Sequence, residues 1–165
     1  MYSGTIQSVF VRERMMIKLP VILLACFALA SCSSNEDTHQ GQPVTKRKAV
    51  FKEMLRSFEP MGLMVRERKP YNAAEFLKYA EALQGLSSQP WHYFTADSNY
   101  APTRAKPDVW DKPAEFKQAQ QRFMDASTLL VSTAKTGDFT KVQHDFAAVE
   151  DSCKSCHQQF RGIPR

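Results

Sequence analysis

The chain has 165 residues and a formal net charge of +5 at pH 7, which suits one domain of ordinary globular composition. Hydrophobic residues make up 43% and charged residues 24% of the sequence, and these proportions exclude a disordered chain and a largely membrane-embedded one. No run of basic residues is longer than Lys46-Arg47-Lys48, so the charge gives no reason to expect nucleic-acid binding.

The first 31 residues have the pattern of an export signal. An apolar run from Leu19 to Ala30 is too short to span a bilayer, and it follows basic residues at Arg12, Arg14 and Lys18. This pattern predicts a secretory signal. Since the residues before Met15 add nothing that such a signal needs, we expect translation to begin at Met15 or Met16.

The apolar run ends in Leu29-Ala30-Ser31-Cys32, which resembles the signal sequence of bacterial lipoproteins. The resemblance implies that residues 1–31 are removed and that Cys32 becomes the acylated first residue, with a plain secretory signal and an uncleaved anchor as alternatives. It implies a periplasmic protein held at a membrane, and Ser33, where an aspartate would favour the inner membrane, favours the outer one. The polar composition of residues 32–43 predicts a flexible tether before a folded domain over residues 44–165.

Apolar residues at helical spacing predict four helices. The first spans residues 44 to about 66, and Pro60 inside it predicts a kink or a break. The second begins after Asn72, the third at about Pro113 and the fourth after Asp138. No stretch has the alternation of a strand. The prediction is therefore an all-α protein, an antiparallel four-helix bundle, in which cofactor sites form between facing helices.

A long connection, residues 89–112, joins the second and third helices. Loops of this length without structure of their own are uncommon in compact domains. Aromatic residues beside Arg104 and Lys106 can resemble a nucleic-acid surface, but the area that such rings bury favours packing across one end of the bundle. The aromatic residues of the connection are Trp91, Tyr93, Phe94, Tyr100 and Trp110.

The fourth helix carries the pattern CKSCH at residues 153–157, which is typical of covalent haem attachment. The thiols of Cys153 and Cys156 can form thioethers with the haem vinyl groups, and the imidazole of His157 can bind the iron. These three residues lie at positions i, i+3 and i+4, on one face of the helix. The alternatives are a thioredoxin-like redox pair, which follows a strand, and a zinc site, which needs a second ligand pair. The pattern predicts one covalent haem c.

The order of these features resembles the cytochrome c′ family, the class II cytochromes c. The resemblance covers roughly residues 45–161 and implies a four-helix bundle with haem c on its C-terminal helix. It rests on Arg47 four residues before Phe51, on Pro70 to Ala74, on Leu86 to Trp91, on Lys106-Pro107 with Trp110, on Gly137-Asp138, and on residues 153–157 followed by Phe160-Arg161.

The resemblance also implies roles for the residues that match. Cys153 and Cys156 hold the haem, and His157 is the axial ligand of the iron. Arg47 takes the place of an arginine close to a haem propionate, whereas its spacing alone would make it a solvated surface residue. Arg161 matches an arginine packed beside the proximal histidine, a position where a helix C-terminus also favours a cation.

Phe51 matches the position that faces the distal side of the haem. Phenylalanine cannot bind iron, so the resemblance implies a five-coordinate haem that binds NO, with CO as a further ligand. An apolar distal side without a hydrogen-bond donor disfavours O₂ more than NO or CO. The alternative is a one-electron carrier of the periplasm, in which the haem is weakly ligated or Met54, one turn further on, is the sixth ligand. Packing in the core is the other expected role of Met54.

Two further expectations concern activity and partners. An enzyme is not expected, because His92 and His144 have no partner that the sequence places near them for acid–base catalysis. The expected partners are haem, a diatomic gas, a membrane through the lipid and, in the alternative function, a redox protein. The family resemblance also makes a homodimer through the first two helices a candidate assembly.

Overall fold

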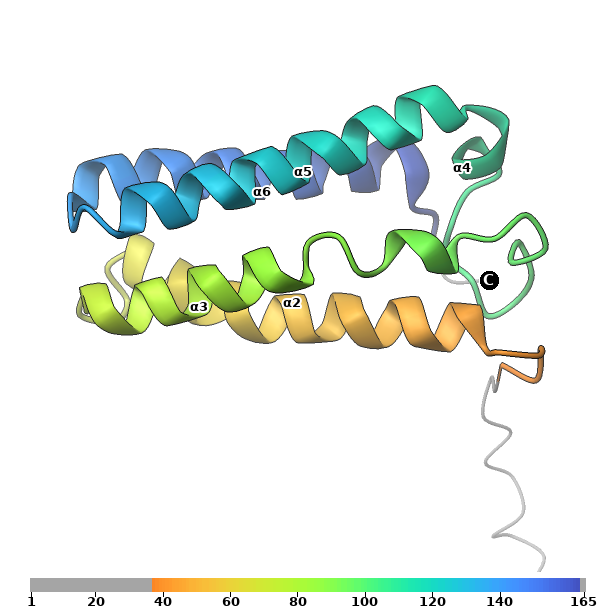
Figure 1. Cartoon of the computed structure of the whole chain (residues 1–165), viewed down its shortest axis with the longest axis horizontal. Coiled ribbons are helices and arrows are strands. Elements are labelled where there is room, and N and C mark those ends of the chain that lie inside the picture. The colour runs from red at the N-terminus through yellow and green to blue at the C-terminus, as the bar shows by residue number, and fades with distance from the viewer. Residues whose placement is uncertain (1–36, 164–165) are drawn as a thin grey trace, which may run out of the picture. The chain divides into compact units, whose positions relative to one another are not determined.

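The computed structural model describes residues 37–163, in which every regular element is a helix. The four long helices lie side by side as the predicted bundle (Figure 1). The predicted signal and Cys32 lie outside the described residues, within which no helix is long and apolar enough to cross a membrane. In chain order the elements are α2 (Pro43–Val65), α3 (Ala73–Leu86), the 3₁₀ helix η2 (Trp91–Tyr93), α4 (Asp108–Asp111), α5 (Pro113–Ala134) and α6 (Phe139–Phe160).

The helix ends follow local chemistry. The side chain of Asn72 accepts a hydrogen bond from the backbone N–H of Glu75, and that of Asp138 accepts one from Lys141, so each caps the helix that follows it. Gly137 separates α5 from α6 with a positive φ of 72°, a conformation that costs glycine little. By contrast, α2 continues through Pro60 to Val65, so the predicted break does not occur.

The described fold includes residues 37–43, which precede the predicted domain boundary at residue 44. Asp37 is 1% exposed, and its carboxylate accepts hydrogen bonds from the Tyr100 hydroxyl at 2.7 Å and the Thr45 N–H at 3.0 Å. The ring of His39 stacks on that of Tyr100 with 3.4 Å between centroids. Residues 37–43 therefore pack on the 89–112 connection and are not a flexible tether, because a buried carboxylate holds them there.

The core fills the space between the four long helices. Phe58 of α2 stacks on Phe146 of α6 with ring centroids 4.5 Å apart, and Phe76 of α3 meets the same ring edge-on at 6.5 Å. Burying one side chain of this size contributes about 1.5–3 kcal/mol. The largest fully buried side chains include Phe76, Phe146, Met61, Met64, Leu83 and Leu130.

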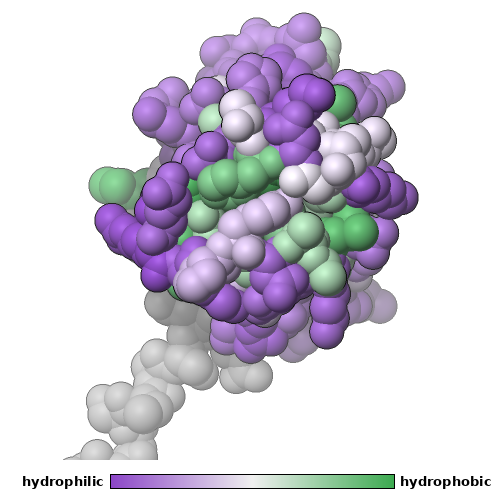
Figure 2. Space-filling view, turned by 90° about the vertical axis from the view of Figure 1, so that its left-hand side faces the viewer, coloured by the Kyte–Doolittle hydropathy of each residue, from purple (hydrophilic) through white to green (hydrophobic). Residues whose placement is uncertain are grey.

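The two ends of the bundle differ. At the end with the α2–α3 and α5–α6 connections, hydrophilic surface surrounds an apolar area (Figure 2), and Tyr71 packs against Phe139 with 4.5 Å between ring centroids. At the other end, the 89–112 connection crosses between α3 and α5 (Figure 1). A second apolar cluster lies there, made by Val109, Phe116, Ala119 and Phe160. This packing of the connection agrees with its aromatic content.

Candidate functional site

A cavity of about 600 Å³ lies between α2, the 89–112 connection, α5 and α6. Its volume falls within the range of about 300–1,000 Å³ that is usual for sites of small molecules and cofactors. The charged side chains that line it come from three places: Arg47, Lys48 and Lys52 of α2, Arg104 of the connection, and Arg161 just after α6. The inner walls are apolar and largely aromatic, with Phe51, Met54, Phe58, Leu83, Trp91, Phe94, Phe116, Phe123 and Phe160.

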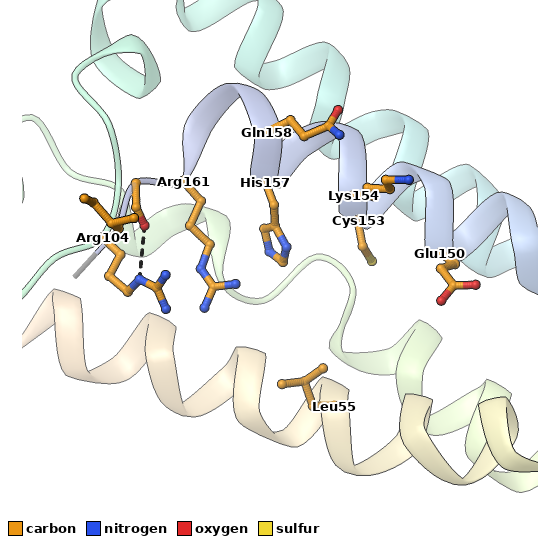
Figure 3. A pocket seen from close by; sticks show the side chains of 10 residues that line it. Leu55, Arg104, Glu150, Cys153, Lys154, His157, Gln158 and Arg161 are labelled. Atoms are coloured by element: carbon orange, nitrogen blue, oxygen red, sulfur yellow. Dashed lines mark hydrogen bonds between the residues drawn. The ribbon is translucent and has the colours of Figure 1, made fainter.

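The three residues of the predicted haem attachment all line this cavity. Cys153, Cys156 and His157 lie in the last two turns of α6, on the face turned toward α2. In Figure 3 the side chains of Cys153 and His157 point from α6 across an open groove toward Leu55 of α2. The structure therefore brings the expected residues together at one wall of the cavity.

Burial keeps these side chains neutral before a cofactor is attached. It raises the pKa of the Cys153 thiol to about 11 and also raises the pKa of Cys156. Partial burial lowers the pKa of His157, and the cations of Arg161 and Arg104 lower it further. A neutral imidazole is the form that binds a metal, so the surroundings of His157 favour the ligand form.

The residues present fit a covalently bound haem. Two thiols and an imidazole on one helix face supply the attachment points and an iron ligand, and the adjoining aromatic cavity suits a flat, apolar macrocycle. A zinc site fits less well: within residues 37–163, no group of three or more His, Cys, Asp or Glu side chains is arranged to hold a metal ion.

Arg47 is buried, at 3% exposure, so the expectation of a solvated surface residue is wrong. Its guanidinium donates hydrogen bonds to the carbonyl oxygen of Tyr93 at 2.9 Å and to the carbonyl and hydroxyl oxygens of Ser98 at 3.0 and 2.8 Å. A fourth bond reaches the Thr103 hydroxyl at 2.6 Å, and the guanidinium carbon lies 4.4 Å from the centre of the Phe94 ring. Arg47 thus ties α2 to the connection, and its role beside a propionate stays a prediction.

Arg161 lies where α6 ends, as expected, but its neighbour Arg104 was not singled out from the sequence. The two chain segments pair as an isolated antiparallel bridge, in which the Gly162 N–H donates to the Arg104 carbonyl at 2.7 Å. The Nε–H of Arg104 donates in return to the Gly162 carbonyl at 3.1 Å (Figure 3). Both guanidinium groups reach into the groove beside His157.

The α2 wall of the cavity carries Phe51, as the resemblance implied. Its ring meets those of Trp91 and Phe94 edge-on, with centroids 5.8 and 6.5 Å away. Met54 is 5% exposed and belongs to the core, which agrees with packing as its role. Leu55 was missed by the sequence reasoning, although it lies one turn beyond Phe51 on the same face, and it lines both the cavity and the groove.

The remaining histidines lie away from the cavity. His144 has a partner that the sequence reasoning did not foresee: its Nδ1 lies 2.9 Å from the carboxylate of Asp145, which also accepts the hydroxyl of Thr133. The hydrogen bond from Thr133 to Asp145 joins α5 to α6, and 85% of the His144 side chain is exposed. Neither His92 nor His144 lines the cavity or the groove.

The comparisons with known proteins agree with this geometry. Residues 42–161 match the family described as cytochrome C′. A cytochrome c′ from Alcaligenes xylosoxydans xylosoxydans is 35% identical over 118 residues, which cover 72% of this chain and 91% of that protein. A second, from Pararhodospirillum photometricum, is 33% identical over 119 residues, covering 72% of this chain and 94% of that protein.

Solved structures share the fold. Cytochrome c prime from Shewanella frigidimarina superimposes with a TM-score of 0.73 at 29% identity, covering 78% of this chain and all of that one. A carbon monoxide-bound variant of cytochrome c prime from Alcaligenes xylosoxidans gives a TM-score of 0.71 at 33% identity, with the same coverage. With its two thiols on the last helix of a four-helix bundle, this chain belongs to the cytochrome c′ family, whose members bind covalent haem c.

Proposed function

We propose that the protein binds NO, and CO as a further ligand, at a five-coordinate haem. The observation that carries the proposal is the position of Phe51 on the α2 wall of the cavity, opposite the helix that presents His157. A phenylalanine ring has no lone pair to offer the iron. The haem would supply an iron with one coordination position left for a small ligand.

The described side chains also determine which ligand would be favoured. Between Phe51 and Phe58, the side chains of α2 that line the cavity are apolar, except for Lys52, which is exposed. A hydrogen bond stabilises bound O₂, and such a wall does not offer a donor. NO and CO depend less on a hydrogen bond. The edge-on packing of Phe51 against Trp91 and Phe94 holds its ring in the wall and limits the space for larger ligands.

Similar proteins support this choice of ligand. Solved structures of cytochrome c prime from Alcaligenes xylosoxidans include a carbon monoxide-bound variant and nitric oxide complexes of other variants. Those chains are about one-third identical to this one and share its bundle.

We expect the ferrous haem protein to show a five-coordinate, high-spin absorption and resonance Raman spectrum and to bind NO. Phe51→Met places a thioether on the same wall and should shift a substantial fraction of the haem to six-coordinate, low-spin iron. Leu63→Met is the matched control, because Leu63 lies on α2, is 45% exposed and does not line the cavity. A six-coordinate spectrum of the unmodified ferrous protein would contradict the proposal and favour an electron carrier.

We also propose that the protein is exported and anchored to the outer membrane through a lipid on Cys32. The support is the sequence: a basic segment, a short apolar run and the Leu29-Ala30-Ser31-Cys32 pattern. Mass spectrometry of the mature protein should find an acylated N-terminal Cys32, and Cys32→Ser should release the protein into the soluble periplasmic fraction. Recovery of an unmodified N-terminus upstream or downstream of Cys32 would contradict the anchor.

A further inference from the structure

Arg104 and Arg161 form a pair of cations whose charge no carboxylate in the described part of the chain neutralises. Both side chains line the cavity and the adjoining groove, and Figure 3 shows them side by side next to His157. Within residues 37–163, the carboxylate that lines the groove is that of Glu150, which lies by Cys153 and forms an ion pair with Arg66. Partial burial lowers the pKa of Arg161, and the nearby cation of Arg104 lowers it further.

The backbone holds this pair in place. The carbonyl of Phe160 accepts the N–H of Lys106 at 2.9 Å, and the N–H of Gly162 binds the Arg104 carbonyl at 2.7 Å. The Nζ of Lys106 adds a bond of 2.8 Å to the carbonyl of Gln158. Two segments more than 50 residues apart thus present their arginines to the same groove. Because only the Nε–H of Arg104 is used within the described residues, the outer N–H groups of its guanidinium remain available as a fork for a carboxylate.

Arg47, which the resemblance places near a propionate, is already engaged. Its two terminal nitrogens donate four hydrogen bonds to Tyr93, Ser98 and Thr103, and its guanidinium lies over the Phe94 ring. Turning it toward a ligand would leave buried oxygen atoms of the connection without donors, which costs about 1–3 kcal/mol for each. In this chain Arg47 is therefore better placed to hold the connection than to hold a ligand.

The chemistry of haem c indicates which anion suits Arg104 and Arg161. The vinyl groups that react with cysteines lie at one edge of the macrocycle, and the two propionates lie at the opposite edge. Cys153 and Cys156 fix the vinyl edge on α6, whereas both arginines lie at the same end of the cavity as the connection, beyond His157. We propose that Arg104, with Arg161 beside it, forms the carboxylate site that holds a haem propionate in this protein.

The test is the reduction potential of the haem protein as a function of pH. With both arginines present, the propionate should stay ionised and the potential should vary little between about pH 5 and 8. Arg104→Gln should lower the potential at the upper end of this range, because a cation near the iron is lost. It should also make the potential rise as the pH falls, because the released propionate now becomes protonated in this range. Arg104→Lys should restore most of the wild-type profile.

Two further measurements distinguish the possible sources of the anion. Arg47→Gln should reduce thermal stability but leave the reduction potential nearly independent of pH. If Arg47→Gln made the potential depend on pH and Arg104→Gln did not, the proposal would be overturned. If inorganic phosphate shifts the potential of the wild type but not of Arg104→Gln, the site binds free anions and not the propionate. The inference depends on haem attachment but not on gas binding, so a protein that fails to bind NO can still confirm it.

Discussion

His157→Ala should abolish the normal axial ligation of the iron while the haem stays covalently attached. Cys153 and Cys156 form the attachment, and His157 alone among the described residues that line the cavity is a histidine. We expect a complete loss of the wild-type ferrous spectrum, with haem still bound to the polypeptide after denaturation and solvent extraction. Absorption spectra and the intact mass of the protein measure the two results separately.

His144→Ala is the matched control for this change. His144 lies 13 residues earlier on the same helix, and its side chain is largely exposed and does not line the cavity. Its spectrum should equal that of the wild type. Added imidazole should restore part of the axial ligation in His157→Ala by entering the space left by the side chain. An unchanged spectrum of His157→Ala would show that another residue is the ligand.

Arg47→Met should lower the free energy of unfolding by about 2–4 kcal/mol. The change keeps much of the volume but removes the donor for four oxygen atoms of the connection, and each buried acceptor left unsatisfied costs about 1–3 kcal/mol before water enters. Urea unfolding of the haem-bound protein measures this loss. Amide hydrogen exchange should increase most in residues 93–104, since Arg47 anchors that segment.

Arg56→Met is the control for Arg47→Met. Arg56 lies on the same helix, and its ion pair with Glu53 is exposed, so its removal should cost less than about 1 kcal/mol. Equal losses for the two variants would mean that the buried hydrogen bonds of Arg47 contribute little. A large loss confined to Arg47→Met would support its role as an anchor.

Features that depend on neighbouring residues could be predicted from the sequence. The spacing of apolar residues gave the four long helices, and the side chains of Asn72 and Asp138 cap the predicted helix starts because capping joins residues three apart. The shared face of Cys153, Cys156 and His157 follows from helix geometry in the same way. Pro60 is an exception for the predicted break, because α2 continues through it to Val65.

Features that join distant residues could not be predicted from the sequence. Asp37 and Tyr100 form a hydrogen bond although they lie 63 residues apart in the sequence, and so do Arg104 and Gly162, which lie 58 residues apart. Spacing along a helix carries no information about such contacts, which depend on the path of the 89–112 connection. Arg104 therefore looked like one basic residue among several, and residues 37–43 looked like a tether because their composition is polar.

The docking of Asp37 on Tyr100 has a mechanical consequence. Burial, together with the hydrogen bond to Asp37, raises the pKa of Tyr100 to about 12, so its hydroxyl stays protonated and keeps donating at any physiological pH. A force that pulls the chain from its N-terminal side would reach this hydrogen bond before it reaches the backbone of α2. The force would then act on the 89–112 connection, which Arg47 holds beside the cavity. Tension at the N-terminus would therefore act on one wall of the cavity that is proposed to bind the ligand.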